Sequence, residues 1–231
     1  MSQSALLFAW GVVAVGYVVV AVSSLAWTAT DLPVYVVCSA LAALASTFKV
    51  QLPGLTGTIS PGFVFQLIAI ARLSWSENIF IGMVCGLVQC LWRPKSASTI
   101  VQINFNAATI ALSAALAYGV AHGLAPGSTD PILRLAVAGV VLLVTNTLLV
   151  ATILCLLKSE PIGNVWRALQ PKAVPYYFIG SVLAGVWSRA QVTVGTSLVA
   201  LVSVYLLHLC GPGLVQQLST GAQPTGPAHR T

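Results

Sequence analysis

The stretch PILRLAVAGVVLLVTNTLLVATILCLL, residues 131–157, decides the fold class of this chain. Arg134 is its only charged residue, and the run exceeds the roughly 20 apolar residues with which a helix crosses a bilayer. Similar runs cover 5–27, 99–124 and 194–215. In the whole chain 58% of residues are hydrophobic and 6% are charged, whereas a soluble domain carries about a quarter charged residues. The composition therefore predicts a protein whose outer surface faces the lipid bilayer.

Four shorter apolar runs separate the long ones, at 33–48, 61–73, 77–92 and 173–190. Proline and glycine lie between many of these runs, as expected where helices end. The pattern predicts an all-α polytopic transmembrane bundle of about eight spans, with short broken helices around residues 33–73. Residues 1–215 are expected to form a single transmembrane domain. Residues 216–231 are expected to form a disordered cytoplasmic tail.

The positive charges predict the orientation of these spans. A cytoplasmic N-terminus places seven of the ten Lys and Arg residues at cytoplasmic ends: Lys49, Arg93, Lys95, Lys158, Arg167, Lys172 and Arg230. Cytoplasmic loops usually carry such an excess, so we expect a multi-pass protein of the cell membrane with both termini cytoplasmic. Residues 1–4 contain no Lys or Arg, so the run 5–27 is expected to be a retained helix rather than a signal peptide. The segment 158–172 is expected to lie along the cytoplasmic interface as a short amphipathic helix.

The segment KVQLPGLTGTISPG, residues 49–62, is the first candidate binding region. Short segments interrupted by Gly and Pro often form broken helices whose freed backbone groups line a site in membrane proteins. Thr56, Thr58 and Ser60 supply hydroxyl groups, and a helix that begins near Pro61 could point its N-terminal amides at an anionic group. The alternative interpretation is an ordinary cytoplasmic loop.

Carboxamide side chains within the apolar runs form the second candidate set, which consists of Gln66, Gln89, Gln102, Asn106 and Asn146. An amide in hydrocarbon is costly without hydrogen-bond partners, so these side chains should face the bundle interior. We expect Asn106 and Asn146 to meet across the interface of their helices. Two uses remain open for the set, contact with a ligand and hydrogen bonding between helices, and the second is favoured.

Catalytic and metal-binding patterns are absent from the sequence. Glu77 is placed at the outer end of its run, so no carboxylate is expected within the spans, and the three histidines are isolated. Five cysteines form no CxxC pair, and no HExxH, GxSxG or phosphate-loop motif occurs. We therefore expect no enzyme, no metal and no cofactor. The scattered Lys and Arg residues predict no nucleic-acid partner. Gly82 and Gly86 form a GxxxG motif, which leaves a homodimer open.

The order of three stretches resembles a bacterial membrane-associated sensor domain. These stretches are VQINFNAATIALSAALAYGVAHGL (101–124), VTNTLLVATILCLLKSEPIGNVWR (144–167) and Pro175 to Phe178. In that family a multi-span module precedes a diguanylate cyclase (GGDEF), an HD-GYP phosphodiesterase or a histidine kinase. The resemblance covers roughly residues 35–210. It implies a sensor-like or ligand-binding module in a bacterial inner membrane.

No output domain follows residue 210, which departs from the sensor pattern. If the chain has the sensor role that the resemblance implies, we expect it to be a fragment of a larger signalling protein or to relay helix repacking to a partner in trans. A looser similarity, of architecture alone, is to the substrate-binding subunits of vitamin transporters. It implies the alternative function, a small-molecule transporter or its binding subunit. A structural or assembly subunit is the third hypothesis.

Overall fold

The computed structural model describes residues 2–28, 30–51, 58–92, 98–123, 131–158 and 161–189, together with Val202 and Tyr205. In these ranges the chain forms seven α-helices: α1 (Gln3–Leu25), α2 (Leu32–Ser46), α3 (Gly62–Arg72), α4 (Trp75–Leu91), α5 (Ile100–Gly123), α6 (Pro131–Lys158) and α7 (Ile162–Ser188). A two-residue antiparallel pair, β1 (Val50–Gln51) with β2 (Thr58–Ile59), lies between α2 and α3. The predicted all-α class is confirmed.

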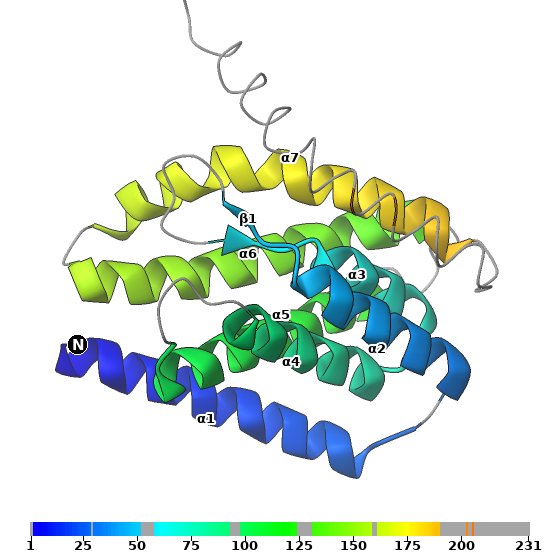
Figure 1. Ribbon diagram of the computed structural model, residues 1–231, viewed down its shortest axis with the longest axis horizontal. Helices are drawn as coiled ribbons and strands as arrows, with labels where there is room; N and C mark the ends of the chain where they lie inside the picture. Colours follow the sequence, from blue (N-terminus) through cyan, green and yellow to red (C-terminus); the bar gives the residue numbers. More distant parts are fainter. Residues whose placement is uncertain are drawn as a thin grey trace, which may run out of the picture.

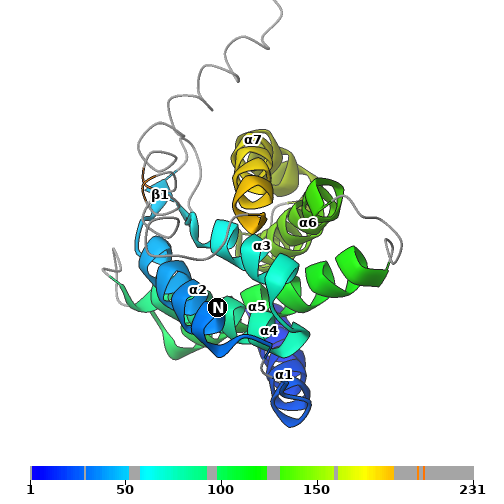
Figure 2. The ribbon, with the colours of Figure 1, turned by 90° about the vertical axis from the view of Figure 1, so that its right-hand side faces the viewer.

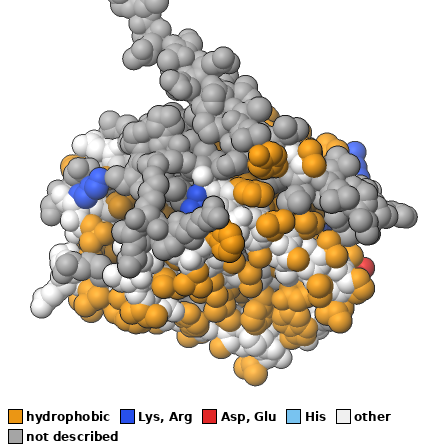
Figure 3. Space-filling view, viewed as in Figure 1, with side chains coloured by type: hydrophobic (Ala, Val, Ile, Leu, Met, Phe, Trp, Pro, Cys, Tyr) orange, Lys and Arg blue, Asp and Glu red, His pale blue; other side chains and the backbone are white. Residues whose placement is uncertain are grey.

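Three helices are long and apolar enough to cross a membrane: Gln3–Leu25, Ile100–Gly123 and Ile132–Lys158. The other apolar helices are shorter, namely α2, α3 and α4, and in α7 the apolar part is Ala173–Ser188. Hydrophobic side chains cover much of the face seen in Figure 3. Over the described residues, the exposed large hydrophobic side chains include Leu7, Val18 and Val140. These features indicate a membrane protein. The predicted last span, 194–215, lies outside the described residues except for Val202 and Tyr205, and the predicted tail lies wholly outside them.

The shortest helix, α3, lies at the centre of the bundle (Figures 1 and 2). It contacts α2, α4, α5, α6 and α7, and every residue from Gly62 to Ile70 is buried. A helix with apolar side chains on all sides is expected to be buried in this way. Its 11 residues span about 16 Å, roughly half of the hydrocarbon thickness of a bilayer. The predicted short helices over 33–48 and 61–73 thus correspond to α2 and to this central half-length helix.

The helices α4 and α5 approach each other closely because α4 carries glycines on the contact face. A Cβ atom at Gly86 would lie 2.6 Å from the Cα atom of Ala107, and one at Gly82 would lie 3.1 Å from the Cβ atom of Ala114. Both glycines are buried. The GxxxG motif that left a homodimer open is therefore used for packing within the chain.

Polar contacts join helix ends at the two ends of the bundle. At one end, the Lys49 ammonium donates to the carbonyl oxygen of Trp92, and Ser2 Oγ donates to the carbonyl oxygen of Leu156 at 3.2 Å. At the other end, the Glu77 carboxylate accepts from the Thr30 hydroxyl at 3.1 Å and from the Ser74 backbone N–H at 2.8 Å. The second of these bonds completes a capping box at the start of α4.

Glu77 corrects one expectation from the sequence. It lies at the helix end, as predicted, but its side chain is fully buried. The expectation that no Asp or Glu is buried is therefore wrong for Glu77, in the first turn of α4. The capping bonds explain how the carboxylate can be buried there, because they replace its contacts with water.

The connection between the last described helices also differs from expectation. A short amphipathic helix over 158–172 was predicted to be separate from the run 173–190, but residues 162–188 form the single helix α7. Pro171 and Pro175 each remove one backbone donor within it. The helix continues through both because it packs along α6 and α3, with Ala173, Tyr176 and Tyr177 buried. Packing on neighbouring helices thus outweighs two lost backbone hydrogen bonds.

Candidate functional site

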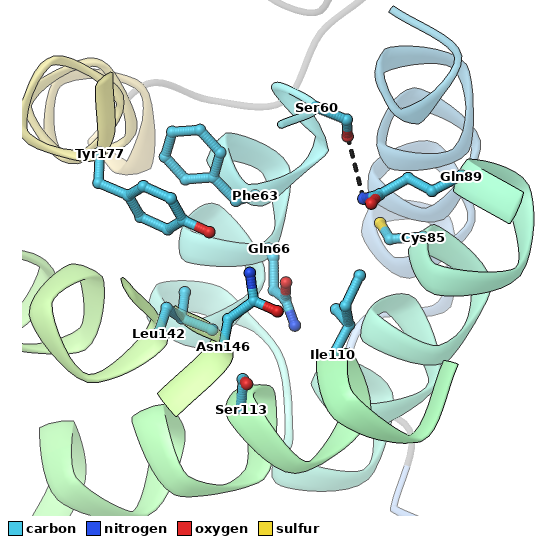
Figure 4. Close-up of a pocket in the computed structure, with 10 residues that line it drawn as sticks. All are labelled: Ser60, Phe63, Gln66, Cys85, Gln89, Ile110, Ser113, Leu142, Asn146 and Tyr177. Atoms are coloured by element: carbon cyan, nitrogen blue, oxygen red, sulfur yellow. Dashed lines mark hydrogen bonds between the residues drawn. The ribbon is translucent and has the colours of Figure 1, made fainter. Parts of the chain in front are cut away.

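A cavity of about 50 Å³ lies beside the first turns of α3, between that helix and α4, α5, α6 and α7 (Figure 4). Six polar side chains line it: Ser60, Gln66, Gln89, Ser113, Asn146 and Tyr177. Four less polar side chains complete the lining: Phe63, Cys85, Ile110 and Leu142. One water needs about 10–15 Å³ of such space, so the cavity holds three or four waters or a solute of similar size. Pockets for drug-sized ligands are larger, at roughly 300–1,000 Å³.

Gln66 is the most unusual residue of the lining. Its side chain is 2% exposed, and its Nε2 atom has no hydrogen-bond partner. An unsatisfied buried polar group costs about 1–3 kcal/mol. The chain makes room for this amide, because a Cβ atom at residue 82 would lie 2.7 Å from Gln66 Nε2, and that residue is glycine. The fold therefore holds a costly donor at the edge of a polar cavity.

Ser60 and Gln89 close one side of the cavity. Gln89 Nε2 donates to Ser60 Oγ at 3.1 Å, as the dashed line in Figure 4 shows. The same oxygen accepts from the backbone N–H of Gly62 at 3.3 Å, which satisfies one of the free donors at the start of α3. These two bonds fix the N-terminal end of the central helix against α4.

Two stacked aromatic rings form another side. Phe63 on α3 and Tyr177 on α7 have ring centroids 4.3 Å apart and an interplanar angle of 23°. The Tyr177 hydroxyl points toward the amide of Asn146 on α6 (Figure 4). Gly180 allows this close packing, since a Cβ atom there would lie 2.3 Å from the Phe63 ring. The ring pair therefore connects the cavity directly to α7.

Four of the eight candidate binding residues from the sequence meet at this cavity: Ser60, Gln66, Gln89 and Asn146. Thr58 lies in β2, and its side chain is outside the described part of the structure, as is the whole of Thr56. The helix that was expected to begin near Pro61 does begin there, at Gly62.

The other two candidates have structural roles. Asn106 Nδ2 donates to the carbonyl oxygen of Gly86 on α4 at 2.8 Å, so its amide joins two helices. The predicted meeting of Asn106 with Asn146 is wrong, because the first faces α4 and the second lines the cavity. Gln102 is exposed, and its Oε1 atom accepts from the backbone N–H of Thr99 at 2.9 Å, which caps the start of α5.

Sequence reasoning missed Ser113, Tyr177 and Phe63. Each stands in an apolar run, where serine and aromatic residues are common packing residues. Tyr177 carries a hydroxyl within a span that should be buried, and such a group usually needs a partner. Phe63 has no comparable signal in the sequence.

The described lining suits binding by hydrogen bonds. Its amides and hydroxyls both donate and accept, and in the described part of the cavity no lining residue is Asp, Glu, Lys, Arg or His.

The resemblance to bacterial sensor domains stays a prediction that depends on the residue patterns alone. Comparison with known protein families, curated proteins and solved structures finds no significant match to this chain.

Proposed function

We propose that this protein binds a small molecule inside the membrane and relays its occupancy as a change in helix packing, as a sensor-like module does. The unpartnered Gln66 amide carries the proposal. A donor that is costly to bury and lies at a polar cavity is explained if a ligand supplies the missing acceptor. Interhelical hydrogen bonding alone does not explain it, because no partner on another helix is present for this atom.

The half-length helix α3 and the continuous helix α7 suggest how occupancy of the cavity is transmitted to the end of the bundle. Phe63 and Tyr177 stack on each other at the cavity, so a ligand that displaces one ring displaces the other. From Tyr177 the helix α7 extends back to Ile162, beside the end of α6 at Lys158. A ligand shifts such an arrangement only by its differential affinity for the two packings. The output passes to a signalling partner in trans at that end of the bundle.

The finer topology belongs to the same proposal. We place eight spans, with Lys49 and Lys158 at the cytoplasmic end and both termini in the cytoplasm, because Lys and Arg residues are in excess at that end. Cysteine labelling from each side of the membrane tests this placement. Reaction of positions 2 and 230 on opposite faces would refute it.

Thermal unfolding of the detergent-purified protein tests the binding function. A panel of small polar metabolites and lipophilic compounds is screened for an increase in Tm. At least one class of compound is expected to stabilise the wild-type protein. Asn146→Ala, which alters the cavity, should lose that increase, whereas Asn106→Ala, whose amide binds Gly86 outside the cavity, should keep it. A panel without any effect, or an increase that survives in Asn146→Ala, would count against binding in the cavity.

Transport is the second candidate, and the central position of α3 favours it. Discontinuous helices that end within the bundle often line the substrate site of transporters, near the middle of the membrane. Uptake of a stabilising compound into proteoliposomes separates the two functions. A transporter accumulates or equilibrates the compound across the vesicle membrane, whereas a sensor binds it without transfer.

A further inference from the structure

The chemistry of the cavity points to a ligand class, and this inference rests on the binding function proposed above. We infer that the cavity binds an uncharged, planar solute of about four non-hydrogen atoms that carries both a hydrogen-bond donor and an acceptor, the chemistry of a carboxamide or a urea. Charge, size, hydrogen bonding and shape each contribute one step.

Charge is the first step. The described lining holds no Asp, Glu, Lys, Arg or His, and the cavity lies beside the buried residues Gly62 to Ile70 of α3. An ion that enters such a site loses its hydration and meets no opposite charge, which costs several kcal/mol. An uncharged solute loses only hydrogen bonds to water, and the lining replaces them.

Size is the second step. The volume of about 50 Å³ corresponds to three or four water molecules. A solute with about four non-hydrogen atoms fits without separating the helices. By the upper limit of ligand efficiency, a molecule of this size binds with a Kd no tighter than about 10⁻⁵ to 10⁻⁴ M.

Hydrogen bonding is the third step. Gln66 Nε2 is a buried donor without an acceptor, and the solute that we infer offers it an oxygen or another acceptor. Ser113 and Asn146 also line the cavity, and their oxygen atoms accept hydrogen bonds from a solute that donates. A molecule with a carbonyl group and an N–H group on adjacent atoms satisfies both requirements within four atoms.

Shape is the fourth step. The rings of Phe63 and Tyr177, which stack on each other, both line the cavity. A planar solute packs on such a ring face with more contact than a tetrahedral one of equal size. Planarity is a property that carboxamides and ureas share.

Three isosteres test the inference directly. Acetamide, acetate and acetamidinium each have four non-hydrogen atoms in one plane and differ mainly in charge. Each is titrated to 100 mM at constant ionic strength, and the Tm of the purified full chain in detergent is measured. Acetamide is expected to raise the Tm in a saturable way with a Kd in the millimolar range, and the two ions are expected to have no saturable effect.

Two variants locate the effect. Gln66→Met keeps the length of the side chain but removes the amide, and should weaken acetamide binding at least tenfold. Asn106→Ala, whose amide bonds to Gly86 instead, should bind acetamide as the wild type does. Equal acetamide binding by Gln66→Met and wild type would overturn the inference.

The remaining outcomes separate the ligand class from the function. If acetate or acetamidinium binds in a Gln66-dependent way and acetamide does not, the class is wrong and the binding function stands. If none of the three binds, the class is also wrong, and the broad panel of compounds with Asn146→Ala then decides the function independently. If that panel also has no effect, both proposals fail.

Discussion

Two glycines one turn apart on α4, Gly86 and Gly82, each lie against a carboxamide side chain, but only one of the two amides has a hydrogen-bond partner for its nitrogen. At the α4–α5 interface, the Asn106 amide donates to the Gly86 carbonyl at 2.8 Å, and the glycine lets the backbones approach. One helical turn away, Gly82 makes room for the Gln66 amide, whose Nε2 atom has no partner. A buried amide with a partner joins helices. A buried amide without one, at a cavity, is the basis of the ligand site proposed above. The contrast therefore depends on partners and not on residue type.

The largest expected effect comes from filling the tight interface. Gly86→Ala places a Cβ atom 2.6 Å from the backbone of Ala107, and the two helices must separate. We expect a loss of about 1–3 kcal/mol in the free energy of unfolding, as overpacking usually causes. Gly119→Ala on α5 is the matched control, because nothing lies within 4 Å of its Cβ position. Unfolding of both variants in mixed micelles measures the difference, and equal stability would contradict the packing described here.

Removing the Asn106 amide, which has a hydrogen-bond partner, should have the next largest effect on the free energy of unfolding. Asn106→Ala deletes the bond to Gly86 and leaves a carbonyl oxygen with one partner fewer, which costs about 1–2 kcal/mol. The same unfolding measurement checks the value. A neutral result would mean that this amide does not join α4 to α5.

Removing the Gln66 amide, whose Nε2 atom has no partner, should instead raise the free energy of unfolding. Gln66→Met has no donor to leave unpaired, so we expect stability to rise by up to about 1 kcal/mol in the absence of ligand. A gain in stability together with a loss of binding is the signature of a residue kept for a ligand. If Gln66→Met instead loses as much stability as Asn106→Ala, the two amides have the same structural role and the contrast between the regions fails.

The smallest effect is expected at the edge of the cavity. Ser60→Ala removes the acceptor of the Gln89 amide and of the Gly62 backbone N–H, at a cost of about 0.5–1 kcal/mol. Since the freed Gln89 amide lines the cavity, accessibility of a cysteine placed at residue 110 to a small thiol reagent should increase. Unchanged reactivity would mean that the Ser60–Gln89 bond does not close the cavity.

Much of the helical architecture could be predicted from the sequence because it depends on local chemistry. The positions of α1 to α6 follow from runs of apolar residues and from Ser, Asp, Pro and Gly near their ends. The half-length helix α3 follows from the Pro and Gly residues of the segment 49–62. The continuity of α7 through Pro171 and Pro175 could not be predicted, because packing on α3 and α6 overrides the local preference.

The candidate site, too, could be predicted only in part from the sequence. Composition and periodicity determined that amides in apolar runs must face the interior, because hydrocarbon offers them no hydrogen bonds. Only the tertiary structure decided which amides find a partner there. Asn106 and Gln66 have equal chemistry in the sequence, but one meets a carbonyl oxygen of α4 and the other meets a cavity. That difference depends on how α3 packs among five other helices. Residues on different helices come together only when the whole bundle packs.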